Sequence, residues 1–150
     1  MKVKSRMATL DNIHDLVRLN ALFNGVRVKF DHLSTQFDYP HRVETPIVVE
    51  VYNRIVGFAS LCLVPHIFYD KPHAEPTELF VEKPYRRRGI GRLLVTHIER
   101  LTYEGGAREL FVLTGFDNDE GQYLYHTIGY ADNDRAMSKD LLDKITTIDS

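Results

Sequence analysis

This chain of 150 residues has a single cysteine, no long apolar run and no large excess of charge of one sign. The single cysteine, Cys62, excludes a disulfide within the chain, which is typical of proteins that stay in the reducing cytoplasm. No apolar stretch approaches the roughly 20 residues that a membrane span requires. The N-terminal residues Met1 to Arg6 lack the apolar run of a secretory signal. We therefore expect a cytoplasmic protein without membrane contact.

The net charge of −2 argues against a protein that coats nucleic acid, because such proteins carry a strong basic excess. The basic residues are nevertheless clustered, at positions 86–88 and 92. A local basic cluster in a mildly acidic protein indicates a small anionic ligand. With 43% apolar and 27% charged residues, residues 1–150 are predicted to form one domain with an ordinary core.

Apolar periodicity predicts strands and helices that alternate along the chain. A tight turn at Asn53 is expected to join two of the strands as a hairpin. The tail after Asp143 is expected to fray. The predicted strands cover residues 2–7, 46–52, 54–64, 77–82, 110–114 and 136–141, and the predicted helices cover 13–24, 89–104 and 120–127, with a short helix within 26–44. This order is typical of a mixed α/β domain with one central sheet.

The most informative segment is the turn between the strand at 77–82 and the helix at 89–104. The first N–H groups of a helix have no partner within the helix, and the helix dipole places partial positive charge there. Gly89 and Gly91 allow close approach of an anion to the backbone, and the neighbouring arginines add donors. These features predict a diphosphate-binding turn. Neither the Walker P-loop nor the G-x-G-x-x-G dinucleotide motif is present.

Two motifs carry a resemblance to a known family. R-x-x-G-x-G at residues 86–91 resembles the [RQ]-x-x-G-x-[GA] motif of the GNAT superfamily of N-acetyltransferases. N-x-x-G-x-x-L-Y-x-x-x-G-Y at residues 118–130 is similar to the family's N-x-x-A-x-x-L-Y-x-x-x-G-F segment. The resemblance covers nearly the whole chain. Gly121 departs from the usual alanine, and Pro84 lies one place later than is typical.

The resemblance implies an α/β (α+β) fold: a central mixed, mostly antiparallel sheet with a splayed parallel strand pair, flanked by helices. In this family acetyl-CoA is the cosubstrate, and its pantetheine arm pairs like an extra strand in the gap between the splayed strands. It is then expected to contact the main chain of Leu79, Phe80 and Val81, with Asn118 and Tyr125 near the thioester. The diphosphate is expected to contact Arg86, Arg87, Arg88, Gly89, Ile90, Gly91 and Arg92. We expect no metal site.

The implied reaction moves an acetyl group to a primary amine by direct attack in a ternary complex. The amine must lose a proton, which a carboxylate can accept, and the departing thiolate benefits from a proton donor. Tyr125 matches the family's tyrosine acid. Glu75 and Glu78 are level as candidates for the base, because their odd separation places them on opposite faces of a regular strand unless a bulge intervenes. Three histidines are further potential bases, although a single histidine is more often structural: His66, His73 and His126.

The acceptor is less well specified by the sequence. Aromatic and acidic residues within 23–44 and 64–76 suit a cationic amine, and a small molecule is favoured over a protein because no long peptide groove can be inferred. The alternatives are a non-catalytic acyl-CoA sensor and a protein lysine or N-terminal acetyltransferase. The use of longer acyl groups is left open. The resemblance also allows a homodimer, and we expect no nucleic-acid partner.

Overall fold

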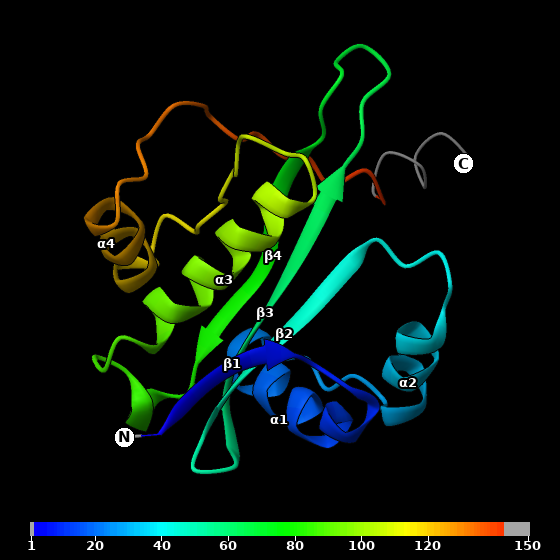
Figure 1. Cartoon of the computed structure of the whole chain (residues 1–150), viewed down its shortest axis with the longest axis vertical. Coiled ribbons are helices and arrows are strands. Elements are labelled where there is room, and N and C mark those ends of the chain that lie inside the picture. The colour runs from blue at the N-terminus through cyan, green and yellow to red at the C-terminus, as the bar shows by residue number, and fades with distance from the viewer. Residues whose placement is uncertain (1, 143–150) are drawn as a thin grey trace.

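The core of the molecule is an antiparallel sheet, seen in Figure 1. The computed structural model describes residues 2–142, and within them four strands pair in chain order: β1 (Val3–Met7), β2 (Glu44–Val51), β3 (Arg54–Val64) and β4 (His73–Val81). Tyr52 and Asn53 form the turn between β2 and β3 with φ of 48° and 66°. Two consecutive positive φ values are typical of a type I′ hairpin, so the predicted turn at Asn53 is confirmed.

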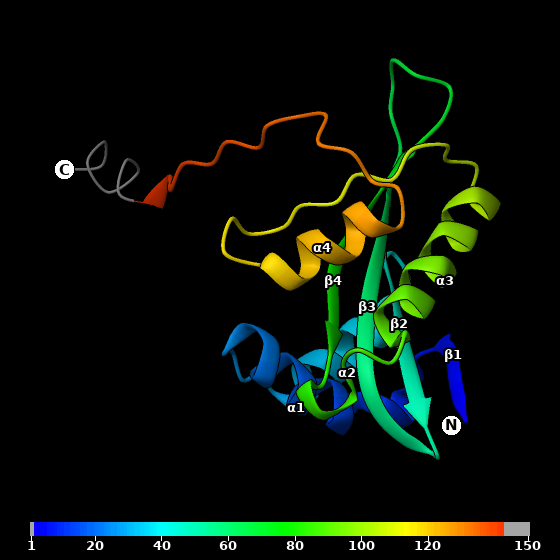
Figure 2. The same cartoon turned by 90° about the vertical axis from the view of Figure 1, so that its left-hand side faces the viewer.

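Helices cover both faces of this sheet, as Figures 1 and 2 show. They are α1 (Ile13–Asn24), α2 (Phe30–Asp38), α3 (Ile90–Glu104) and α4 (Asp119–Thr127), and single 3-10 turns precede α1 at Leu10–Asn12 and α3 at Lys83–Tyr85. The helix predicted within 26–44 is α2. Within residues 2–142 no helix has the length and hydrophobicity needed to cross a bilayer.

The side chains of the sheet alternate between two cores, because successive strand residues point to opposite faces. On one face Ile90, Leu94 and Ile98 of α3 pack on Ile47, Val49 and Leu61. On the other face Leu16 and Leu19 of α1 pack on residues of three strands, namely Val48, Phe58 and Phe80. The sheet thus separates an α3 side from an α1 side, and β4 contributes side chains to the cores on both sides.

Two predicted strands differ from the structure. Residues 110–114 contribute only one bridge, in which Leu110 pairs parallel to Ala74, so the splayed parallel pair is reduced to that contact. Residues 136–141 form no strand, and Met137 and Leu141 are exposed; among residues 2–142 the sheet consists of β1 to β4, and this segment is not part of it. β4 also begins four residues earlier than predicted, at His73. The predicted fraying after Asp143 lies outside the described residues.

Glu82, directly after β4, fastens α1 to the sheet. Its carboxylate accepts hydrogen bonds from Arg18 of α1 at 2.5 Å and from Arg54 of β3 at 3.3 Å, while Arg18 also donates to the carbonyl of Ile55 at 2.8 Å. Burial alone would raise the pKa of the Glu82 carboxyl, but the hydrogen bonds and charges of Arg18 and Arg54 outweigh burial and lower it. The folded protein therefore favours the ionised carboxylate.

We expect Glu82→Gln to lower the free energy of unfolding by about 2 kcal/mol at neutral pH, since a charge-assisted hydrogen bond contributes about 1.5–3 kcal/mol. A lowered pKa stabilises the fold above the unfolded value of 4.5, and this contribution is lost as the pH falls through the folded value. Urea unfolding at pH 7 and pH 3 should show a difference between wild type and variant that shrinks in acid. The exposed pair of Glu120 and Arg86 is the control, because Glu120→Gln should change stability by less than about 0.5 kcal/mol. An equal effect of both variants would contradict the role of Glu82.

Candidate active site

The turn between β4 and α3 exposes the N-terminus of a helix. Gly89 is the N-cap of α3, with φ of 80°, a left-handed conformation that glycine adopts without steric cost. A methyl group at Gly91 would lie 3.1 Å from Cδ2 of Leu124, so glycine at this position allows α3 and α4 to approach closely. The first N–H groups of α3 have no partners within the helix and carry partial positive charge. The turn therefore has the chemistry of an anion site.

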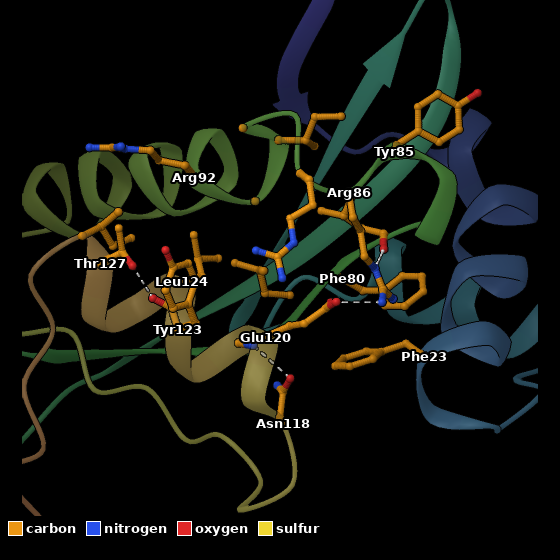
Figure 3. A pocket seen from close by; sticks show the side chains of 18 of the residues that line it. Phe23, Phe80, Tyr85, Arg86, Arg92, Asn118, Glu120, Tyr123, Leu124 and Thr127 are labelled. Atoms are coloured by element: carbon orange, nitrogen blue, oxygen red, sulfur yellow. Dashed lines mark hydrogen bonds and ion pairs between the residues drawn. The ribbon is translucent and has the colours of Figure 1, made fainter.

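A cavity of about 460 Å³ lies over this turn, between β4, α3, α4 and the end of α1. Figure 3 shows Phe23 and Phe80 at one side of the cavity and side chains of α4 at the other. The predicted cofactor residues that line it are Leu79, Phe80, Val81, Arg86, Arg87, Gly89, Ile90, Gly91, Arg92 and Asn118. Arg88 does not line it; its guanidinium lies 5.6 Å from the ring centroid of Tyr85. Tyr125 is also outside the lining.

Arg86, which lines the cavity, is held by three contacts. Its Nε donates to the carbonyl of Val81 at 2.8 Å, and its Nη1 donates to a carboxylate oxygen of Glu120 at 3.2 Å. The guanidinium also lies 5.4 Å from the ring centroid of Phe80. In Figure 3 Glu120 extends from α4 towards Arg86. The carboxylate of Glu120 thus occupies part of the Arg86 guanidinium, which a bound anion would otherwise contact.

The outer edge of β4 is largely open. Beside Ala74 the backbone bonds to the segment after α3, since Ala74 donates to the carbonyl of Glu109 at 3.1 Å and accepts from the N–H of Phe111 at 2.8 Å. Beyond that bridge β4 pairs with β3 alone among the described residues. Leu79, Phe80 and Val81 lie on this edge, where an extended ligand can pair in the manner of an added strand, although the carbonyl of Val81 already accepts a hydrogen bond from Nε of Arg86.

A bulge in β4 places both candidate bases on one face of the sheet. Glu78 pairs with Ser60 and Glu75 pairs with Cys62, and the register shifts by one residue between them. Because Ser60 and Cys62 are two residues apart on β3, Glu75 and Glu78 share the α1 side. Both carboxylates therefore lie on the same face of the sheet, with Thr77 as the extra residue of the bulge, and neither lines the cavity.

Glu44 of β2 adds a third carboxylate to this face. One of its oxygens accepts hydrogen bonds from Ser60 at 3.1 Å and from the hydroxyl of Thr77 in the bulge. Burial raises the pKa of the Cys62 thiol, and the charges of Glu44 and Glu75 raise it further, which indicates that Cys62 lies within the field of both carboxylates. The α1 side of the sheet is thus acidic, whereas the turn before α3 is basic.

Asn118 and Tyr125 have different environments on α4. Asn118 caps the helix by accepting a hydrogen bond from the N–H of Gly121 at 3.0 Å. A methyl group at Gly121 would come within 2.4 Å of the Asn118 side chain, which explains the glycine at this position. Tyr125 is 8% exposed and packs edge-on against Tyr130. Burial raises the pKa of Tyr125 to about 12, so its phenol keeps its proton at neutral pH.

Several residues that line the cavity were missed from the sequence. Glu120, Tyr123 and Thr127 of α4 also line the cavity. Glu120 and Thr127 lie four residues before and three residues after Leu124, so helical spacing would have identified them, whereas Tyr123 is its neighbour in the chain. Leu22 and Phe23 also line the cavity. Their position depends on how α1 packs against β4, where the ring of Phe23 stacks on Phe80 with centroids 5.1 Å apart, and no local pattern encodes that contact.

The comparisons with known proteins agree with this geometry. A family model described as the acetyltransferase (GNAT) family matches residues 13–130. An uncharacterized N-acetyltransferase of Chlorobaculum tepidum is 36% identical over 67 residues, which make up 45% of this chain and 40% of that protein. The aligned part thus spans less than half of the curated relative.

Solved structures share the fold. An aminoglycoside acetyltransferase from an uncultured soil metagenomic sample, solved in complex with sisomicin, superimposes with a TM-score of 0.79 at 21% identity over 92% of this chain and 94% of that chain. A ribosomal-protein-alanine N-acetyltransferase from Brucella melitensis has a TM-score of 0.79 at 17% identity over 93% and 99%. At such identities the likeness shows the fold alone.

We expect Gly89→Asp to abolish binding of coenzyme A, because it adds a carboxylate where the turn presents its N–H groups. Coenzyme A at 100 times its dissociation constant should raise the wild-type melting temperature by roughly 5–10 °C. Gly25→Asp is the matched control, since Gly25 and Gly89 both have positive φ and open space around the missing Cβ. The control should keep the thermal shift, and an equal shift in Gly89→Asp would refute the anion site.

We expect Glu120→Gln to tighten binding of coenzyme A by about fivefold at low salt, because it removes a negative charge that competes for Arg86. Isothermal titration at low and high salt measures the effect, which should weaken as salt screens the charges. Weaker binding by the variant would mean that Glu120 instead holds Arg86 in its binding position.

Proposed function

Because the chain belongs to the acetyltransferase (GNAT) family, we propose that it transfers an acetyl group from acetyl-CoA to a primary amine of a small, multiply charged molecule. The observation that carries this proposal is the meeting of two opposite charge environments at β4. A basic turn lies at the end of that strand, and carboxylates lie along its α1 side. An anionic cosubstrate and a cationic acceptor would therefore meet at one open edge.

The donor set of the turn fits acetyl-CoA. The N-terminus of α3 with Arg86, Arg87 and Arg92 would bind the diphosphate, because backbone N–H groups and guanidinium groups are the usual partners of phosphate oxygens. The open edge of β4 would bind the pantetheine arm through main-chain hydrogen bonds. When bound, acetyl-CoA supplies an activated thioester. The protein's task is then to hold an amine against it and to remove a proton.

Three carboxylates favour a cationic acceptor. Glu44, Glu75 and Glu78 lie on one face of adjacent strands, where they would attract an ammonium group and raise its local concentration. A free amine with a pKa near 10.4 is protonated at neutral pH and must lose a proton before it can attack. A carboxylate at β4 would accept that proton, and direct attack in a ternary complex would follow.

Tyr125 stays our candidate for assisting the leaving thiolate, although it does not line the cavity. A phenol whose pKa is about 12 is a weak donor towards a thiolate, because free thiols have a pKa near 8.5. We infer that Tyr125 stabilises the thiolate by a hydrogen bond rather than by complete proton transfer.

The proposal includes a cytoplasmic location, which the lone Cys62 would suit. A homodimer stays a prediction.

Release of the coenzyme A thiol, followed with a panel of amines, tests the proposal. We expect turnover with sisomicin and with spermidine, both of which carry several ammonium groups, and none with a peptide that begins with alanine. Turnover with the peptide alone would overturn the small-molecule assignment in favour of a protein acetyltransferase. Binding of acetyl-CoA without turnover on any amine would favour an acyl-CoA sensor.

A further inference from the structure

Two histidines and a glutamate form a hydrogen-bonded chain at the start of β4. His66, in the loop between β3 and β4, has its Nε2 2.7 Å from Nδ1 of His73. The Nε2 of His73 lies 3.1 Å from Oε1 of Glu75. The chain therefore runs from an exposed imidazole through a half-buried one to a carboxylate on the acidic face of the sheet.

His73 occupies a fixed place at the point where β4 parts from its parallel neighbour. The ring of Phe111 packs edge-on against His73 with centroids 5.3 Å apart, and the backbone of Phe111 bonds to Ala74. Glu75 is the next residue along β4, between this bridge and the bulge at Thr77. The carboxylate thus lies where the open edge of β4 begins.

We propose that Glu75 accepts the proton of the acceptor amine and that His73, supported by His66, is its positioning residue. This inference rests on the proposed function and extends it to residues outside the cosubstrate cavity. It distinguishes the roles of Glu75 and Glu78, which the sequence leaves as equal candidates for the base. A histidine held by a second histidine on one ring nitrogen can present the other nitrogen to a carboxylate in a fixed direction.

The direction of donation follows from the two contacts. When both imidazoles are neutral, Nε2–H of His66 donates to Nδ1 of His73, and Nε2–H of His73 donates to Oε1 of Glu75. Oε1 is then engaged, and Oε2 is left to accept from the substrate. In the reaction an N–H bond of the ammonium breaks and its proton passes to Glu75, and the freed lone pair forms the N–C bond as the C–S bond of the thioester breaks. The nitrogen then loses a second proton, which the departing thiolate takes up, so that the products are the amide and the thiol of coenzyme A.

Glu78 has a different partner. Its Oε2 accepts a hydrogen bond from Nδ2 of Asn24 at 3.1 Å, at the end of α1. That contact ties Glu78 to the helix that covers the acidic face. Its partner is a side-chain amide, which does not titrate at neutral pH, whereas the partner of Glu75 is an imidazole. We therefore assign Glu78 to attraction of the cationic acceptor, and Glu75 to proton removal.

Paired variants of His73 test this assignment kinetically with the amine that wild type acetylates, sisomicin or spermidine. His73→Leu removes the donor and should lower kcat about 30-fold with little change in the KM for acetyl-CoA. His73→Gln can restore a donor at the position of Nε2 and should stay within about threefold of wild type. Glu75→Gln should lower kcat by at least 100-fold, whereas Glu78→Gln should chiefly raise the KM of the amine.

The double variant His73→Leu/Glu75→Gln separates a positioning role from a merely structural one. If His73 acts through Glu75, adding His73→Leu to Glu75→Gln should lower kcat by less than a further factor of about two. Additive losses would overturn the proposal. A retained thermal shift with coenzyme A shows that each variant is folded.

A measurement without any acceptor decides the matter independently of the proposed function. The imidazole N–H proton of His73 should give a downfield resonance in the NMR spectrum of the wild-type protein, because it is bonded to a carboxylate. Glu75→Gln should remove that resonance, and Glu78→Gln should leave it. An unchanged resonance in Glu75→Gln would overturn the inference. If no amine of the panel is acetylated, the proposed function fails, and the resonance still reports on the chain.

Discussion

The backbone of β4 imposes the constraint on which the site depends. Backbone N–H and C=O groups require a partner when they are buried, and among residues 2–142 the outer edge of β4 pairs with a neighbouring segment only beside Ala74. The strand is nevertheless anchored, because β3 pairs along its inner edge and both cores pack against its two faces. A rigid strand with an open edge can bind an extended ligand without rearranging, and the diphosphate-binding turn follows directly from its end.

The sequence predicted the parts of the site that depend on local geometry. Gly89 and Gly91 identified the turn, because glycine adopts a positive φ without steric cost and allows a close helix contact. The hairpin at Asn53 was predicted because asparagine also tolerates the positive φ that a tight turn requires. The prediction of a strand at residues 136–141 was wrong, because a strand depends on pairing with a neighbouring strand, which the periodicity of the sequence does not reveal. The packing of Phe23 on Phe80 and the pairing of His66 with His73 join separate segments, so no spacing rule reveals them.

The charges of the molecule are sorted although their sum is small. The net charge of −2 hides an arginine-rich turn beside α3 and carboxylates on the α1 side of the sheet. Glu120 is an exception to this sorting, because it contributes a carboxylate to the basic cavity. Net charge alone would describe an unremarkable acidic protein, whereas the position of each charge relative to β4 describes two binding surfaces.

The bulge at Thr77 has a consequence for how relatives of this chain are compared. A regular strand would direct residues 75 and 78 to opposite faces, and the extra residue reverses that relation. A relative without the bulge would need acids two or four residues apart to build the same face. Carboxylates that serve one purpose can therefore occupy different alignment columns, and two sequences can retain the same site while disagreeing about the position of its acid.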